Sequence, residues 1–130
     1  MAKLTSPQAV IFDVYDTLFS NSDNGWHETF NTIVNELELP MESLELWRDW
    51  KKYERRFRTV RTNMDDPANS PPFKTYATSW AECFQRVFDD HSINGDAIAA
   101  ARLSVKHMAR CNPFPETLSA LNRIASRVRV

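Results

Sequence analysis

Helical periodicity dominates this chain of 130 residues and limits what it can fold into. Apolar residues recur at three- and four-residue spacing in five segments, which predicts five helices that each bury one face. We expect these helices from about Gly25 to Glu38, from about Met41 to Thr62, from near Phe73, after Asn94 and from Pro115. The expected buried faces include Trp26, Phe30, Trp50, Val60, Tyr76, Trp80, Phe84, Ile98 and Leu118. The second and third helices are rich in aromatic residues, so we expect them to pack on each other.

Only one short segment has the pattern of a buried strand. Residues 9–12 (Ala-Val-Ile-Phe) are apolar on both faces and end at Asp13, which is typical of a central parallel strand. Such a strand needs hydrogen-bonding partners on both sides, and the other strand candidate is residues 127–130. The sequence therefore predicts an α/β fold of which the chain holds the first β-α-β part. A helical module interrupts this part, with boundaries near Ser20 and at residues 112–115.

Composition excludes several classes of function. The chain has two glycines, Gly25 and Gly95, too far apart for a glycine-rich loop that cradles the phosphates of a nucleotide. The net charge of −1 gives no reason to expect a nucleic-acid or membrane-surface partner. No apolar run reaches the roughly 18 residues of a membrane span, and no signal-peptide pattern is visible. Cys83 and Cys111 lack the spacing of a zinc site, so we expect a buried structural thiol at Cys83 and a reducing, cytoplasmic location.

Candidate chemistry gathers in residues 12–19, Phe-Asp-Val-Tyr-Asp-Thr-Leu-Phe. An aspartate at the carboxyl end of a parallel strand faces the crevice where such sheets bind ligands. Its carboxylate can act as a nucleophile and form a covalent intermediate that water later cleaves. The alternative is that Asp13 and Asp16 are turn or helix-capping residues, and spacing alone leaves both interpretations open.

This segment closely resembles the first motif of the haloacid dehalogenase superfamily, an apolar strand followed by Asp-x-x-x-Thr-Leu. Phosphatases of that superfamily usually have a second aspartate two places after the nucleophile, where this chain has Tyr15. Tyrosine at this place is similar to the 2-haloacid dehalogenase branch, whose motif reads Phe-Asp-x-Tyr-Gly-Thr-Leu. A phosphate ester needs a general acid to protonate its leaving group, whereas a halide leaves as a stable anion. Tyr15 therefore favours cleavage of a carbon–halogen bond.

The resemblance implies a Rossmann-like core domain with an inserted helical cap. Residues 1–20 would be the first strand and catalytic loop of the core, residues 21–111 the cap, and residues 112–130 the return to the core. In the cap, Leu46-Trp47-Arg48 resembles a dehalogenase segment whose arginine holds the substrate carboxylate or the departing halide. Residues 113–118 resemble the proline-rich turn that precedes the helix before the second strand.

The implied substrate is a small anionic organic molecule, most simply a short 2-haloacid. Asp13 would displace the halide and form an ester, and water would then attack the ester carbonyl. Thr17 would order the loop, Val14 and Tyr15 would contact the substrate, and Arg48 would hold the anion. This route uses no cofactor. In the alternative, a phosphatase of the same superfamily, Mg²⁺ is held by the Asp13 carboxylate and the Tyr15 backbone carbonyl.

A third interpretation is a non-catalytic helical interaction module or inactive fragment. The other catalytic groups of the superfamily would follow Val130, so we expect the chain by itself to be inactive and to need the remainder of the core domain as a partner. A homodimer through the tryptophan-rich cap is a further option.

Two features depart from the family pattern or add charge to it. Asp16 replaces the family's glycine and either places a second carboxylate beside the nucleophile or faces solvent. Residues 48–61 carry an excess of positive charge, which we interpret as a solvated helix face, with steering of an anionic substrate as the alternative.

His27, His91 and His107 lack ligand spacing, so we expect surface or capping roles for them.

Overall fold

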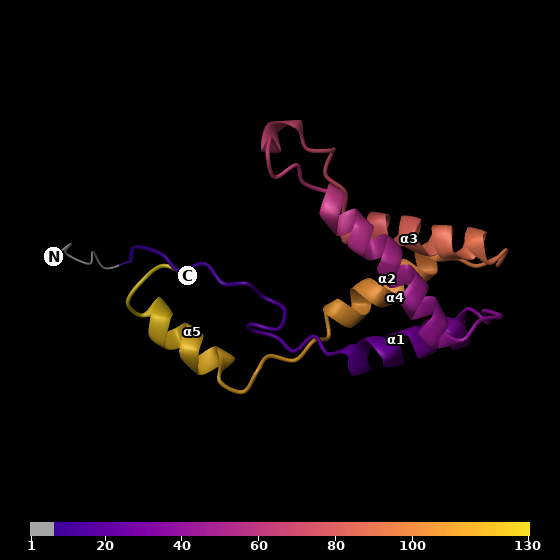
Figure 1. Ribbon diagram of the computed structural model, residues 1–130. Coiled ribbons are helices and arrows are strands. Elements are labelled where there is room, and N and C mark those ends of the chain that lie inside the picture. Colours follow the sequence, from indigo (N-terminus) through magenta and orange to yellow (C-terminus); the bar gives the residue numbers. More distant parts are fainter. Residues whose placement is uncertain (1–6) are drawn as a thin grey trace. The chain divides into compact units, whose positions relative to one another are not determined.

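The computed structural model describes residues 7–130, and its secondary structure is helical (Figure 1). The helices are α1 (Asp23–Glu36), α2 (Ser43–Val60), α3 (Tyr76–Asp90), α4 (Ala97–Met108) and α5 (Thr117–Ala125), with a short 3-10 helix η1 (Pro67–Asn69) between α2 and α3. All five helices predicted from the sequence are confirmed, and their ends lie close to the predicted positions.

The predicted α/β fold is wrong, because residues 7–130 contain no β-strand and no sheet. The two segments predicted as strands do meet, through an isolated parallel bridge between Ala9 and Arg129. The Val10 N–H donates to the Arg129 carbonyl at 2.9 Å. This contact does not extend into a ladder, and the side chain of Ile11 is 96% exposed. A parallel strand is stable when neighbouring strands pair with it and helices cover both its faces, and neither condition is met here.

The chain divides into two compact units. The helical unit is Asp23–Ala109 and contains helices α1 to α4. The terminal unit combines the chain up to Ser22 with the chain from Arg110, and it contains α5.

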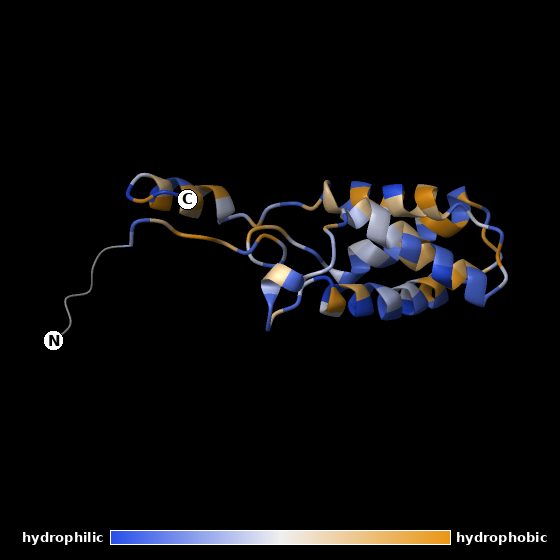
Figure 2. Cartoon of the chain, turned by 90° about the horizontal axis from the view of Figure 1, so that it is seen from above, coloured by the Kyte–Doolittle hydropathy of each residue, from blue (hydrophilic) through white to orange (hydrophobic). Residues whose placement is uncertain are grey.

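Aromatic side chains from three helices fill the core of the helical unit. The rings of Trp50 on α2 and Phe84 on α3 lie 5.6 Å apart between centroids, and Phe30 on α1 lies 5.3 and 5.6 Å from these two rings. Helices α2 and α3 therefore pack on each other, as predicted. Each helix of this unit carries both hydrophobic and hydrophilic residues, as expected when one face is buried (Figure 2).

The predicted faces are wrong at their edges. Val60 and Ile98 are 58% and 60% exposed, and Tyr76 and Leu118 are also exposed. On α4 the buried face consists of small residues, Ala97, Ala100, Ala101 and Ser104. Small side chains let α4 approach its neighbours closely, so the larger Ile98 is left facing outward.

Capping hydrogen bonds mark where two helices begin. The Thr75 side chain accepts a hydrogen bond from the Thr78 N–H before α3, and the Asp96 side chain accepts one from the Ala99 N–H before α4. These bonds satisfy N–H groups that have no partner inside the helix.

Gly95 is held against the core, and we expect Gly95→Ala to destabilise the helical unit by about 1–3 kcal/mol. A Cβ atom added there would lie 2.7 Å from a ring carbon of Phe88, which is fully buried and cannot move aside freely. Without this clash, alanine would stabilise the protein by restricting the unfolded chain, so the sign of the effect is informative. Urea denaturation followed by tryptophan fluorescence measures it, with Asn94→Ala in the same loop as the control. A more stable Gly95→Ala variant would contradict the close contact.

Stability of the helical unit should also fall as the solution is acidified below the ordinary histidine pKa. Burial lowers the pKa of His107 from 6.5, an effect partly opposed by Glu28, and Nδ1 of His107 lies 2.8 Å from the Thr29 hydroxyl. Because the unfolded chain binds this proton more tightly than the folded chain, stability is lost as the pH falls through 6.5 toward the lowered pKa. Unfolding free energies at pH 7.5 and 5.5 should differ less in His107→Gln than in the wild type. An unchanged pH dependence in the variant would contradict this assignment.

Candidate functional site

The candidate nucleophile lies in a closed loop of the terminal unit, residues 13–19, here called the Asp13 loop. The N–H groups of Leu18 and Phe19 both donate to the Val14 carbonyl, at 2.8 and 3.0 Å. The Asp16 N–H donates in turn to the Phe19 carbonyl at 2.7 Å. The loop is therefore stabilised by its own backbone, which limits the positions that its side chains can take.

Thr17 is the side-chain partner of Asp13. The Thr17 hydroxyl donates to Oδ2 of Asp13 at 3.2 Å, and both residues are exposed to solvent. The structure thus brings together two of the residues that the sequence analysis selected. This bond orients one carboxylate oxygen of Asp13. Because Asp13 is exposed, its carboxylate remains accessible to a small molecule.

Val14 and Tyr15 follow Asp13 in the same loop and are both partly exposed, at 43% and 38%. Tyr15 is also joined to Phe19 by an isolated bridge, which ties its backbone into the loop. The two side chains therefore lie on the solvent-accessible part of the loop that carries Asp13. Their contact with a substrate stays a prediction.

Asp16 is a turn residue, which is one of the two interpretations that its place in the sequence left open. Its φ of 62° lies in the left-handed region, which favours glycine and which aspartate tolerates better than most residues. Its carboxylate accepts a hydrogen bond from the Asn21 N–H at 2.9 Å. Asp16 therefore acts as a turn residue that fastens the end of the loop.

The segment before α5 anchors the Asp13 loop. Ser20 N–H donates to the Asn112 carbonyl at 2.9 Å, and Phe114 N–H donates to the Leu18 carbonyl at 3.1 Å. The hydroxyl of Thr117, the first residue of α5, donates to the same Leu18 carbonyl at 2.8 Å, and Thr117 is 5% exposed. Sequence reasoning missed Thr117, because a bond between residues 99 positions apart leaves no local pattern.

Arg48, the predicted anion holder, belongs to α2 of the helical unit. Its side chain is exposed, and its Nε donates to the Leu44 carbonyl at 3.3 Å. Arg48 lines a shallow cavity together with His27 and Asn31 from α1 and with the residues that begin α2. Asp13 belongs to the terminal unit, so the joint action of Arg48 and Asp13 in one site stays a prediction.

Within residues 7–130, one group of side chains has atoms of the kind that bind metal ions. Ligand atoms of Glu45, Asp49 and His91 all lie within 4.8 Å of one another. Both carboxylate oxygens of Asp49 are already engaged, one by Lys52 Nζ at 2.6 Å and the other by Nε2 of His91 at 2.8 Å. The hydrogen bond from Lys52 lowers the pKa of Asp49, with a smaller contribution from His91. The carboxylate of Asp49 is thus already paired, and the group is a hydrogen-bonded cluster of surface side chains.

No helix within residues 7–130 combines the length and apolar character needed to cross a membrane.

Comparison with known proteins identifies no similar protein. No protein-family model matches the chain, and no curated protein or solved structure matches it either.

Proposed function

We propose that this chain supplies the nucleophile of a hydrolase of the haloacid dehalogenase superfamily, and that Asp13 is that nucleophile. The observation that carries the proposal is the exposed Asp13 carboxylate, oriented by the Thr17 hydroxyl within a loop closed by backbone hydrogen bonds. The two residues stand four positions apart in the Asp-x-x-x-Thr motif, and the hydrogen bond gives this spacing a physical reason.

The reaction proceeds in two steps. In the first, a carboxylate oxygen of Asp13 attacks C2 of a 2-haloacid, the carbon–halogen bond breaks, and the halide leaves with the bonding electrons. In the second, water attacks the carbonyl carbon of the resulting ester. The ester bond then breaks, the Asp13 carboxylate is restored, and a 2-hydroxy acid and a proton are released.

Tyr15 and Arg48 are the residues that favour a 2-haloacid as the class of substrate. Tyr15 occupies the place where a phosphatase would hold its general acid, and a departing halide needs no proton. The Arg48 guanidinium would bind the substrate carboxylate, for which its charge and its fork of donors are suited. We place this activity in the cytoplasm, in keeping with the buried free thiol of Cys83.

Covalent labelling tests the proposal without requiring complete turnover. The chain is incubated with 2-bromopropionate, and the products are examined by mass spectrometry of the intact protein and of its peptides. We expect one propionate group attached to Asp13 as an ester that hydroxylamine removes. Thioethers formed on cysteine resist hydroxylamine, so the two kinds of adduct are distinguishable. Where the ester is hydrolysed in the same sample, repeated turnover in H₂¹⁸O should place the label in Asp13.

A paired release assay separates dehalogenation from phosphate-ester hydrolysis. Bromide release from 2-bromopropionate and phosphate release from p-nitrophenyl phosphate are measured with and without EDTA. Phosphate release that EDTA abolishes, in the absence of bromide release and of an ester on Asp13, would overturn the dehalogenase assignment in favour of an Mg²⁺-dependent phosphatase. The absence of an ester on Asp13, the step that needs no complete turnover, would contradict the proposed nucleophile and favour a non-catalytic interaction module.

A further inference from the structure

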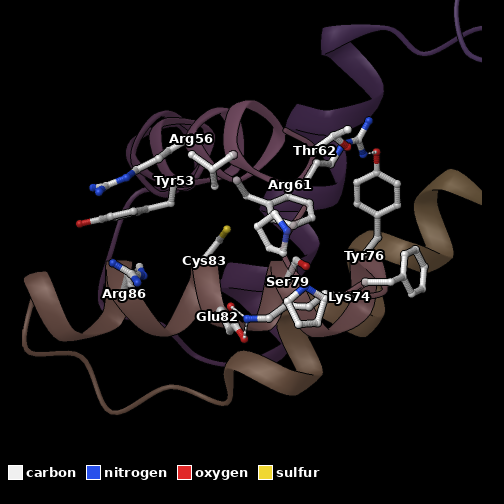
Figure 3. A pocket seen from close by; sticks show the side chains of 15 residues that line it. Tyr53, Arg56, Arg61, Thr62, Lys74, Tyr76, Ser79, Glu82, Cys83 and Arg86 are labelled. Carbon is white, nitrogen blue, oxygen red and sulfur yellow. Dashed lines mark hydrogen bonds and ion pairs between the residues drawn. The ribbon is translucent and has the colours of Figure 1, made fainter. Parts of the chain in front are cut away.

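A cavity of about 670 Å³ lies within the helical unit, far along the sequence from the Asp13 loop. It is formed by the second half of α2, by residues 71–74 before α3, and by one side of α3 from Tyr76 to Arg86 (Figure 3). We call it the α2–α3 cavity. Its volume falls in the range of sites that bind small organic molecules, roughly 300–1,000 Å³.

Aromatic and apolar side chains form much of its wall. The rings of Phe57 and Tyr76 meet edge to face, with centroids 6.2 Å apart. Pro71, Pro72 and Phe73 also line the cavity, and Phe73 is 91% exposed. This wall suits a ligand with a flat apolar body, which would cover apolar surface that water now contacts.

A buried hydroxyl without a partner lines the same cavity. Ser79 is 1% exposed, and its Oγ has no hydrogen-bond partner among residues 7–130. A buried serine in a helix commonly donates to the carbonyl four residues earlier, as Ser104 does to Ala100 at 3.0 Å. Ser79 does not, although buried polar groups are seldom left unpaired. A polar atom of a ligand in the cavity would give this hydroxyl its missing partner.

Positive charge predominates around the cavity. Lys74 Nζ contacts both carboxylate oxygens of Glu82, at 2.6 and 2.9 Å, so these two charges offset each other. Arg61 donates to the Tyr76 hydroxyl at 2.6 Å, which holds its guanidinium beside the aromatic wall. The other cationic residues that line the cavity are Arg56 and Arg86. The charge excess favours an anionic ligand, and guanidinium groups bind carboxylates well.

We infer that the α2–α3 cavity binds a small aromatic carboxylate, with the ring against the wall that Phe57 and Tyr76 form together and polar atoms at Ser79 and Arg61. This site is independent of the function proposed for the Asp13 loop, since all its residues belong to the helical unit.

Cys83 also lines the cavity. The protonation state of its thiol indicates a site that binds a ligand without forming a covalent bond to it. Burial raises the pKa of the Cys83 thiol to about 11, with smaller contributions from Glu54 and Glu82. At neutral pH the thiol stays protonated and behaves as a small apolar group, so we expect no covalent attachment there.

Three probes distinguish this ligand class from others, using calorimetry on the whole chain. 2-Naphthoate has the ring and the charge, 2-naphthamide has the ring alone, and acetate has the charge alone. We expect 2-naphthoate to bind at least about tenfold more tightly than either of the other two. Equal affinity for 2-naphthoate and 2-naphthamide would overturn the anionic assignment, and no binding of 2-naphthoate would overturn the site.

Two variants with a matched control locate the binding. Ser79→Ala should weaken 2-naphthoate binding by roughly fivefold and Arg61→Gln by roughly tenfold. Arg55→Gln removes an exposed charge from the same helix outside the cavity lining and should leave the affinity unchanged. Circular dichroism checks that each variant is folded, and NMR shifts of the Ser79 and Cys83 amides report binding in the wild type. Equal affinities across the three variants, or NMR shifts confined to other residues, would overturn the proposal.

Discussion

Replacing Phe84 with alanine is expected to lower the free energy of unfolding of the helical unit by about 3–5 kcal/mol. Phe84 is fully buried on α3, and its ring lies 5.6 Å from those of Phe30 and Trp50 and 6.1 Å from that of Phe88. Alanine would leave a cavity where three helices meet, and helices that already pack tightly collapse only partly into such a space. The expected loss is a large part of the roughly 5–15 kcal/mol that stabilises an ordinary domain.

Phe73→Ala provides the matched control for this substitution. It removes the same side chain from a residue that is 91% exposed, so the change in unfolding free energy should stay within about 0.5 kcal/mol. Urea denaturation monitored by circular dichroism gives both values. Equal losses in the two variants would contradict the position of Phe84 at the centre of the core.

Asp13→Asn is expected to abolish formation of the 2-bromopropionate ester. Asparagine has nearly the same shape as aspartate, and its amide oxygen still accepts a hydrogen bond from Thr17. The amide is neutral and far less nucleophilic than a carboxylate, so the loop would be kept while the attacking group is lost. Removal of a catalytic nucleophile lowers the rate of related covalent reactions by roughly 10⁴-fold or more, which places the adduct below detection.

Asp16→Asn makes the same chemical change three positions away and should retain the ester on Asp13. Asparagine tolerates the positive φ at this position, and its side-chain oxygen can accept the Asn21 N–H. Loss of the adduct in both variants would indicate that the loop depends on negative charge in general. An adduct of equal yield in Asp13→Asn would contradict the role of Asp13 as nucleophile.

The helices could be predicted from the sequence because their signal is local. Apolar residues three and four positions apart share a helix face whatever the rest of the chain does, and Trp50, Trp80 and Phe84 are buried as that spacing predicts. The edges of each face were less predictable. Val60 and Ile98 fit the helical spacing, yet they are exposed.

The candidate nucleophile could also be found from the sequence, for the same reason of short range. Asp13 and Thr17 are four residues apart, and the bond between them closes within one loop. The positive φ of Asp16 agrees with the turn role that the sequence left open for this residue. Ser79, by contrast, looks in the sequence like an ordinary polar residue of a helix.

The amino-acid sequence alone determined the five helices, most of their buried residues and the Asp13 loop, since each depends on residues a few positions apart. Tertiary structure alone decided whether a sheet forms. Residues 9–12 have the composition of a buried strand, but their burial requires partners that local pattern does not specify, and one bridge between Ala9 and Arg129 is the contact they make. The bond from Thr117 to Leu18 and the α2–α3 cavity were likewise decided by tertiary structure, because they join segments far apart in the chain.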